Sequence, residues 1–181
     1  PGDGVEHMYW AGQYAADTKP DVIIHLGDHW DMPSLSSYDV GKKSFEGRRY
    51  TRDITAGLNA MEHFLAPIRE EKKRLRSNKK RTWNPRMVFL LGNHEQRIER
   101  AIESDAKLEG LMSYDDFKLE KGGWEVVPFL QPIVIDGIAY CHYFTICFMV
   151  RSFTVANLML KKKFMSCIME SVKTDDLTNA R

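Results

Sequence analysis

Two short apolar runs, each ended by a glycine and then by polar side chains, constrain the fold most strongly. Residues 21–26 read DVIIHL before Gly27, and residues 87–91 read MVFLL before Gly92. Runs of this length and composition are typical of strands buried on both faces of a parallel sheet. Helical patterns lie around them, at residues 5–18, 54–68 and 95–108. Strands that alternate with helices predict an α/β domain.

Composition places the chain among ordinary globular proteins. Its 181 residues suit one domain, with 43% apolar and 28% charged residues. The net charge of +1 gives no general reason to expect nucleic-acid or membrane binding. No apolar run approaches the ~20 residues that span a bilayer, and the three cysteines form no CxxC pair. We therefore expect no membrane partner and a reducing compartment, the cytoplasm, with the oligomeric state left open.

Polar side chains follow each of the two glycines. The first loop, residues 27–31, reads GDHWD, and the second, residues 92–95, reads GNHE. In open α/β sheets, chemistry gathers at the carboxyl ends of the strands, and neighbouring strands lie ~4.8 Å apart. A CH pair on a later predicted strand offers a third contribution. The sequence thus predicts that Asp28, Asn93 and His142 meet at one edge of the sheet.

These residue types suit hard to borderline divalent metals. The carboxylate of Asp28 can bridge two cations, while the amide oxygen of Asn93 and the imidazole of His142 can complete the shell of one. Two ions ~3.5–4 Å apart can share a hydroxide, which is available at neutral pH, and clamp a phosphate during in-line attack. His94 lies next to a predicted ligand without being one. We therefore predict that His94 is the general acid that protonates the departing alkoxide.

GDHWD followed by GNHE resembles the second and third motifs of the calcineurin-like metallophosphoesterases. The runs around them, DVIIHLGDHWDMPS and VFLLGNHEQRIERAIE, are similar to phage-borne members. The resemblance implies a four-layer αββα sandwich that hydrolyses phosphomonoesters or phosphodiesters, nucleotides or nucleic acids among them, with two divalent metals (Mn, Fe, Zn or Ni). It also implies that Asp28 bridges the metals, that Asn93 and His142 bind the second one, and that His94 donates the proton. A phage-encoded member would act in the host cytoplasm.

The chain departs from the family pattern at both ends. The first motif, Asp-x-His, is absent, and the sequence begins just after its expected place. The last motif should contain Gly-His, but the best-aligned stretch, residues 168–173, reads IMESVK, and no histidine follows His142. On the family pattern this leaves Asp28 as the sole ligand of the first metal. We predict one domain over residues 1–181, a fragment at its amino end and divergent at its carboxyl end, with a helical and basic insertion at 39–86.

Several residues have both a functional and a structural interpretation. His29 could contact substrate or serve a supporting or surface role, and Asp31 could orient a ligand or cap the following turn. Arg97 could hold a substrate phosphate by bidentate contacts or lie on a solvated helix face. Glu95 offers carboxylate oxygens that could support a ligand or contact substrate. His142 could instead be a core histidine, and turn chemistry is the alternative for the Gly-Asp and Gly-Asn pairs.

The basic run between the two loops supports a second hypothesis. Residues 69–86 hold nine Lys or Arg against two Glu, which would attract a phosphate backbone, and Trp83 could add base stacking. The alternative function is therefore a non-catalytic phosphate or nucleic-acid binding module on a degenerate phosphoesterase scaffold. The run could overhang the site or be only the solvated end of a helix. A nucleophilic Cys141 has little support, because strand neighbours such as Cys141 and His142 point to opposite faces.

Overall fold

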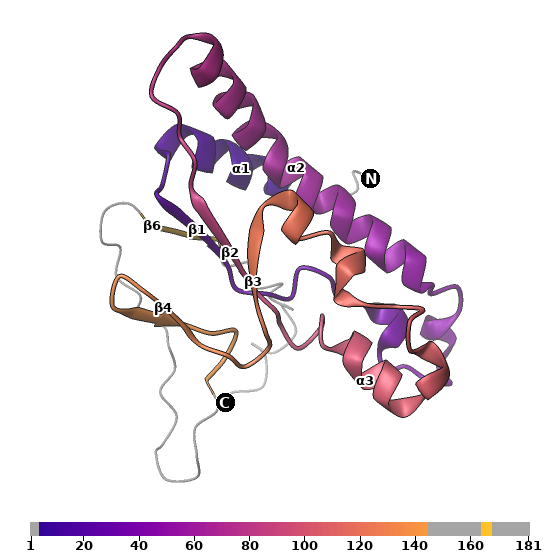
Figure 1. The fold of residues 1–181 in the computed structure, drawn as a ribbon. Coiled ribbons are helices and arrows are strands. Elements are labelled where there is room, and N and C mark those ends of the chain that lie inside the picture. The colour runs from indigo at the N-terminus through magenta and orange to yellow at the C-terminus, as the bar shows by residue number, and fades with distance from the viewer. Residues whose placement is uncertain (1–3, 145–163, 168–181) are drawn as a thin grey trace, which may run out of the picture.

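Helices and parallel strands alternate along the chain. The computed structural model describes residues 4–144 and 164–167 (Figure 1). The helices are α1 (Glu6–Thr18), α2 (Tyr50–Ser77) and α3 (Arg97–Ser104). The strands are β1 (Val22–His25), β2 (Arg86–Leu90), β3 (Trp124–Val127), β4 (Ile133–Ile135), β5 (Ile138–Tyr140) and β6 (Phe164–Cys167). The described part of the chain is therefore a mixed α/β fold, which confirms the predicted class.

A parallel sheet with the strand order β3-β2-β1-β6 forms the centre of this part. Strand β1 is buried at every position and β2 at all but its first, because both faces of the sheet are covered there. Val22 of β1 pairs with Arg86 of β2, and His25 pairs with Phe89. The two strands therefore end side by side, and each leads into one of the glycine-led loops at the same edge of the sheet.

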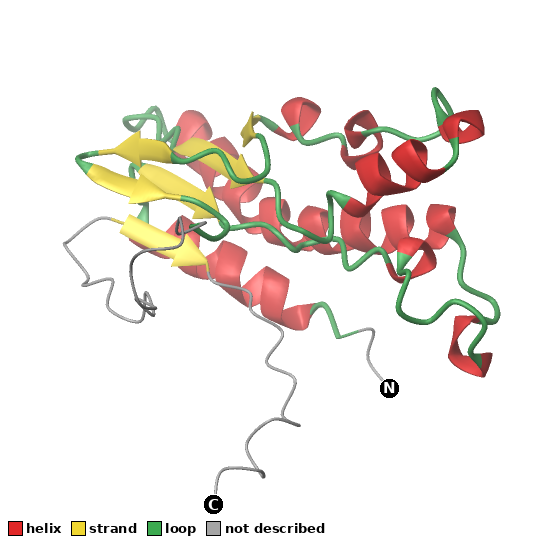
Figure 2. Ribbon diagram, turned by 90° about the horizontal axis from the view of Figure 1, so that it is seen from below, coloured by secondary structure: helices red, strands yellow, loops and turns green. Residues whose placement is uncertain are grey.

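The two faces of the sheet are covered by different elements. Helices α1 and α2 lie over one face, and the antiparallel hairpin β4–β5 lies on the other side (Figures 1 and 2). Alternate residues of β2 show this division: Met87 and Phe89 join the cluster on the helix side, whereas Val88 and Leu90 join the cluster that contains Tyr140 of β5. The described residues thus form three layers, namely helices, parallel sheet and hairpin.

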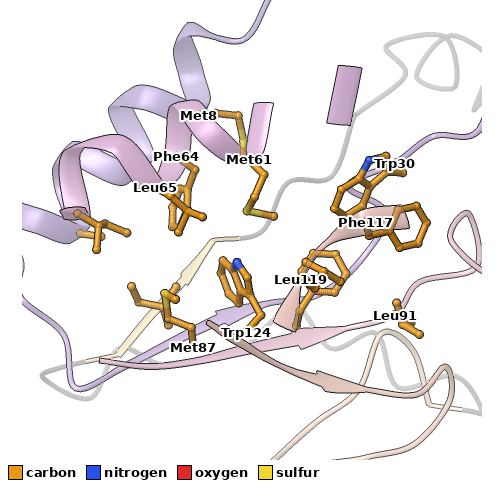
Figure 3. Packing of buried hydrophobic residues seen from close by; sticks show 14 of the residues in the cluster. Met8, Trp30, Met61, Phe64, Leu65, Met87, Leu91, Phe117, Leu119 and Trp124 are labelled. Carbon is orange, nitrogen blue, oxygen red and sulfur yellow. The ribbon is translucent and has the colours of Figure 1, made fainter. Parts of the chain in front are cut away.

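Large side chains fill the space between the helices and the sheet (Figure 3). Phe64 of α2 faces Trp124 of β3 with their ring centroids 6.0 Å apart. A Cβ on Gly12 would stand 2.1 Å from the carbonyl oxygen of Phe64, so glycine lets α1 touch α2. Trp30, from the first loop, stacks on Phe117 at 4.2 Å and donates its indole N–H to the carbonyl of Ile54. This packing anchors the loop beneath α2.

Helix α2 is longer than its apolar pattern predicts, and it continues through Pro67 to Ser77. Proline inside a helix removes one backbone hydrogen bond and costs ~3 kcal/mol. Phe64, Leu65 and Ile68 are buried around the proline, and packing of this kind supplies most of the stability of helices in proteins. The helix therefore belongs to the main core through these residues.

Two predicted boundaries are wrong. The helix predicted over 95–108 ends at Ser104, where the side chain of Asp105 accepts from the backbone N–H of Lys107 and starts a separate turn. The later strand, which was expected to carry the CH pair, ends at Tyr140, which pairs with Ile133. The next position would pair with Pro132, which has no N–H to donate. His142 therefore lies in a bend after β5, not on a strand.

Some features predicted near the carboxyl end lie outside the described residues. Strand β6 lies within the described residues, whereas the stretch 168–173, the expected place of the last family motif, lies outside them. Among the helices of residues 4–144, none is both long and apolar enough to cross a membrane.

Candidate functional site

The two glycine-led loops lie in direct contact at the carboxyl ends of β1 and β2. A Cβ on Gly27 would stand 2.6 Å from the backbone nitrogen of Gly92, and Gly27 has a φ of +94°. A Cβ on Gly92 would stand 2.2 Å from Oδ1 and 2.5 Å from the backbone nitrogen of Asp28. All three distances are far below ordinary contact, so both positions require glycine. The glycines allow the two loops to approach each other as well as to turn.

Glu95 joins the two loops from the inside. Its side chain is fully buried, with 0% of the residue exposed. Its Oε2 accepts from the backbone N–H groups of Asp28 at 2.9 Å and Gly92 at 2.8 Å, and its Oε1 accepts from Trp30 at 3.0 Å. Burial raises the pKa of Glu95, helped by the nearby Asp28 carboxylate and opposed by the three N–H donors. The sequence interpretation left this residue between ligand support and substrate contact; its contacts are with the backbone of the loops.

The three residues predicted to meet do come together. The Nε2 atom of His142 lies 2.9 Å from Oδ1 of Asn93 and 3.5 Å from Oδ2 of Asp28. The other ring nitrogen of His142, Nδ1, lies 2.5 Å from the carbonyl oxygen of Leu26. His142 is therefore tied to the end of β1 by one nitrogen while the other faces the two loops.

This donor set fits a divalent cation. A carbonyl can only accept, so Nδ1 of His142 carries a hydrogen, and Nε2 is the ring atom that faces the two oxygen atoms. An imidazole nitrogen, an amide oxygen and a carboxylate oxygen that converge in this way could hold a divalent cation. Adjacent ligands of an octahedral ion lie roughly 3 Å apart, because each stands ~2.1 Å from its centre. The separations of 2.9 and 3.5 Å are close to that value.

The three converging donors could hold one cation. Within residues 4–144 and 164–167, no group of three or more His, Cys, Asp and Glu side chains could hold a metal ion. The convergence at the loop edge contains two such residues, Asp28 and His142, and the amide of Asn93 is the third donor. Cys141 is buried, and its thiol donates to the carbonyl of Tyr143 at 3.2 Å, which gives no support to a Cys–His pair.

His94 pairs with Asp31 beside this donor set. Its Nδ1 lies 2.6 Å from Oδ1 of Asp31, and its Nε2 lies 3.3 Å from Nη2 of Arg97. A carboxylate only accepts and a guanidinium only donates, so the ring is the neutral tautomer with its hydrogen on Nδ1. The backbone N–H of His94 also donates to Oδ1 of Asp28 at 3.0 Å. Asp31 thus contacts the ring of His94, the predicted acid, and neither of its two interpretations, orienting a ligand or capping the following turn, named that partner.

Arg97 is held between the loops. Its Nη1 donates to the carbonyl of Asp31 at 2.6 Å and to that of Met32 at 3.3 Å, and 13% of its side chain is exposed. The interpretation of Arg97 as part of a solvated helix face is therefore wrong. One turn further along α3, Arg100 donates to the carbonyl of Asn93 at 2.8 Å.

His29 and His25 lie on the helix side of the first loop. The Nε2 of His29 donates to the carbonyl of Gly57 in α2 at 2.8 Å, so this hydrogen bond connects the first loop to the helix. His25 stacks on Phe89 at 4.5 Å, and its Nδ1 accepts from the N–H of Gly27. Burial lowers the pKa of His29 from 6.5 to about 4 and holds the pKa of His25 well below 6.5. His25 is a core residue.

These two histidines predict a loss of stability in acid. Their pKa values are lower in the folded chain than in the unfolded one, so unfolding takes up protons. The stabilisation is complete above pH 6.5 and is lost as the pH falls from 6.5 towards 4. Urea titrations at about pH 7.5, 6, 5 and 4 measure the free energy of unfolding. His29→Gln, which can still donate to Gly57, should flatten the curve; an unchanged slope would contradict the assignment.

The basic run lies at the opposite edge of the sheet. It ends at Arg86, where β2 begins, whereas the loops follow the other end of β2 at Leu90. A strand of this length spans roughly 15 Å. Trp83 is partly buried and donates its indole N–H to the carbonyl of Pro20 at 2.8 Å, so it is not free to stack on a base. The interpretation in which the run overhangs the site is wrong.

Comparisons with known proteins add no family or relative. Neither the protein-family models, nor the curated proteins, nor the solved structures gave a match to the chain. Functional conclusions therefore depend on the geometry of the two loops and of the bend that carries His142.

Proposed function

We propose that the chain is a metal-dependent phosphoester hydrolase of the calcineurin-like metallophosphoesterase type. The observation that carries the proposal is the convergence of Asp28, Asn93 and His142 at the carboxyl ends of the strands, with His94 alongside. The order of layers also supports it, since helices, parallel sheet and hairpin make an αββ arrangement within the proposed αββα sandwich. The substrate is a phosphomonoester or phosphodiester, and the cation is Mn, Fe, Zn or Ni.

The cation would be held by Oδ2 of Asp28, Oδ1 of Asn93 and Nε2 of His142. When bound, such a cation supplies an acidified water at neutral pH and offsets the negative charge of a phosphate. Asp28 is fixed for this task by His94, whose backbone N–H holds Oδ1 and leaves Oδ2 towards His142. His142 is fixed by the carbonyl of Leu26. Such outer contacts set the direction of a ligand and its tautomer.

His94 would protonate the leaving oxygen from Nε2. Asp31 holds the hydrogen of Nδ1, so Nε2 is the ring atom that would first take up a proton from solvent and then pass it to the leaving oxygen. Arg97 now donates to that atom, and a substrate phosphate offers its guanidinium a stronger, charged acceptor. Arg97 can therefore bind the phosphate and free Nε2 in the same movement. This gives Arg97 the phosphate-binding role foreseen as one interpretation of the sequence.

Mn²⁺ binding and Mn²⁺-dependent hydrolysis test the proposal together. Metal-stripped protein is titrated with Mn²⁺ by calorimetry, and cleavage of bis(p-nitrophenyl) phosphate and p-nitrophenyl phosphate is followed with and without the ion. His142→Ala should weaken Mn²⁺ binding at least roughly tenfold because it removes the sole nitrogen donor of the set. His63→Ala, on α2, is the matched control. Absence of saturable Mn²⁺ binding, or binding indifferent to His142, would sink the hydrolase proposal.

The exposed cations of the basic run keep a nucleic-acid binding module as the second candidate. Lys73, Lys79 and Lys80 are exposed at the amino edge of the sheet. Such a surface would bind a phosphate backbone with an affinity that falls steeply with salt. Salt-sensitive DNA binding that survives Asp28→Asn, without any hydrolysis, would favour this candidate. DNA binding that is unaffected by Lys79→Glu would remove it.

A further inference from the structure

We infer that Glu95 is the positioning residue of the cation site: it holds Asp28 in the backbone conformation that directs Oδ2 towards His142. The inference rests on the proposed function, because it concerns the affinity of that site for a cation. Its basis is separate, since it stands on the contacts of one fully buried carboxylate with two loops. Asp28 and Glu95 are 67 residues apart in the chain.

Asp28 has a backbone that its own side chain does not favour. Its φ is +56°, in the left-handed region that residues with a Cβ rarely adopt. Such a conformation persists only where neighbouring groups determine it. Here the backbone N–H of Asp28 donates to Oε2 of Glu95 at 2.9 Å, and Oδ1 of Asp28 accepts from the backbone of His94 at 3.0 Å. Consecutive residues of the second loop therefore hold both ends of Asp28.

The same carboxylate fixes the residues on each side of the contact. Oε2 also accepts from Gly92 at 2.8 Å, which folds the second loop back on itself, and Oε1 accepts from Trp30 at 3.0 Å. Because Glu95 is buried, water cannot replace a bond that is lost, and an unpaired N–H would be left inside the protein. One side chain thus sets the position of the first loop relative to the second.

Glu95 does not serve as a ligand itself. Both of its oxygens accept backbone N–H groups, and no part of the residue is exposed. Its effect on a cation must therefore pass through Asp28. Outer partners that orient a metal ligand typically change affinity by ~10–100-fold when they are replaced. We expect the same range for Glu95.

The test replaces Glu95 with glutamine, which has nearly the same shape. The new amide can keep one oxygen on Asp28 and Gly92, but its NH₂ group then faces the N–H of Trp30 and repels it. Calorimetric titration should show Mn²⁺ binding weakened by ~10–100-fold relative to the natural chain. Glu103→Gln, on the exposed side of α3, removes the same charge and should leave the affinity unchanged.

A second control separates positioning from general destabilisation. Ile98→Val creates a small cavity in the core beneath α3, since Ile98 is 1% exposed. If Ile98→Val lowers the melting temperature as much as Glu95→Gln but keeps the Mn²⁺ affinity, the effect of Glu95 is on the ligand. Equal losses of affinity in both variants would overturn the inference and leave Glu95 a merely structural residue.

Hydrogen exchange in the natural chain tests the contacts of Glu95 with the first loop without any variant. The amide protons of Asp28 and Trp30 should exchange slowly because both donate to a buried carboxylate. Rapid exchange at both would overturn the inference even if Glu95→Gln failed to fold. If the two amides exchange slowly but the chain does not bind Mn²⁺, the proposed function is wrong, and so is the positioning role of Glu95, which depends on it. Binding that Glu95→Gln leaves unchanged would defeat the positioning role alone.

Discussion

Replacing His94 with alanine is expected to lower the Mn²⁺-dependent hydrolysis of bis(p-nitrophenyl) phosphate by ~10²–10⁴-fold, the usual contribution of a general acid. In the proposed reaction the imidazole takes up a proton at Nε2 and passes it to the leaving oxygen, while Asp31 fixes the ring through Nδ1 at 2.6 Å. Removing the ring removes the proton donor. The measurement is kcat at saturating substrate and Mn²⁺, because the loss concerns the chemical step.

The affinity for Mn²⁺ should survive this substitution. His94 supports Asp28 through its backbone N–H, at 3.0 Å from Oδ1, and alanine keeps that group. His7→Ala, on the exposed side of α1, is the matched control for the loss of a histidine. A fall in kcat below roughly tenfold would show that His94 is not the acid. A parallel loss of Mn²⁺ binding would show that its ring supports the ligands instead.

Asp31→Asn extends the same argument to the partner of His94. The amide can still contact Nδ1, but it can present its NH₂ group to the ring and favour the wrong tautomer. The loss in kcat should therefore be smaller than that of His94→Ala. Adding Asp31→Asn to His94→Ala should cost little more, because the two side chains act as one unit.

The location of the site was predictable because it depends on local sequence and on one topological rule. Each loop follows an apolar run that could only be a buried strand, and parallel neighbours end at a common edge. That placed Asp28 beside Asn93 without knowledge of the fold. His142 was predicted at the same place but on a strand. Pro132, which would sit opposite in the hairpin, cannot donate a hydrogen bond, so the strand ends at Tyr140, two residues before His142.

The supporting contacts were not predictable in the same way. The bonds of Glu95 to Asp28 and Trp30 join residues separated by 67 and 65 positions. A sequence pattern shows a Glu three residues after a glycine, but not whether its carboxylate turns inward. The one available signal is spacing. Glu95 lies three residues before the apolar Ile98, which faces the core from α3, and residues three apart lie on the same side of a helical turn. Arg97 was likewise open to two interpretations until its carbonyl partners fixed it.

The fold was predictable where periodicity was strong and less so where one residue decided an element's end. The pattern of apolar residues in α2 correctly gave its buried face. A proline inside a helix ordinarily interrupts it, but the packing of Phe64 and Ile68 around Pro67 holds the helix together. Asp105 ends α3 early by accepting from the backbone of Lys107. Such side-chain hydrogen bonds compete locally with the backbone hydrogen bonds of the helix. The periodic pattern of apolar residues does not reveal them.

Replacing Gly92 with alanine is expected to abolish detectable Mn²⁺ binding and to destabilise the fold by ~1–3 kcal/mol or more, as overpacking does. The new Cβ would stand 2.5 Å from the backbone nitrogen and 2.2 Å from Oδ1 of Asp28, and 2.8 Å from Oε2 of Glu95. The backbone of Asp28 is not a flexible end that can turn aside. The first loop must therefore move, and Asp28 loses its contacts with both Glu95 and His94.

A matched glycine shows whether the effect belongs to the loop contact. Gly122 also lacks a left-handed backbone, and its Cβ would stand 3.3 Å from the nearest atom, in the side chain of Trp124. Gly122→Ala should change the free energy of unfolding by less than about 1 kcal/mol, since alanine also restricts the unfolded chain. It should leave Mn²⁺ binding intact. If Gly92→Ala binds Mn²⁺ as well as Gly122→Ala does, the two loops are not in the contact on which the cation site depends.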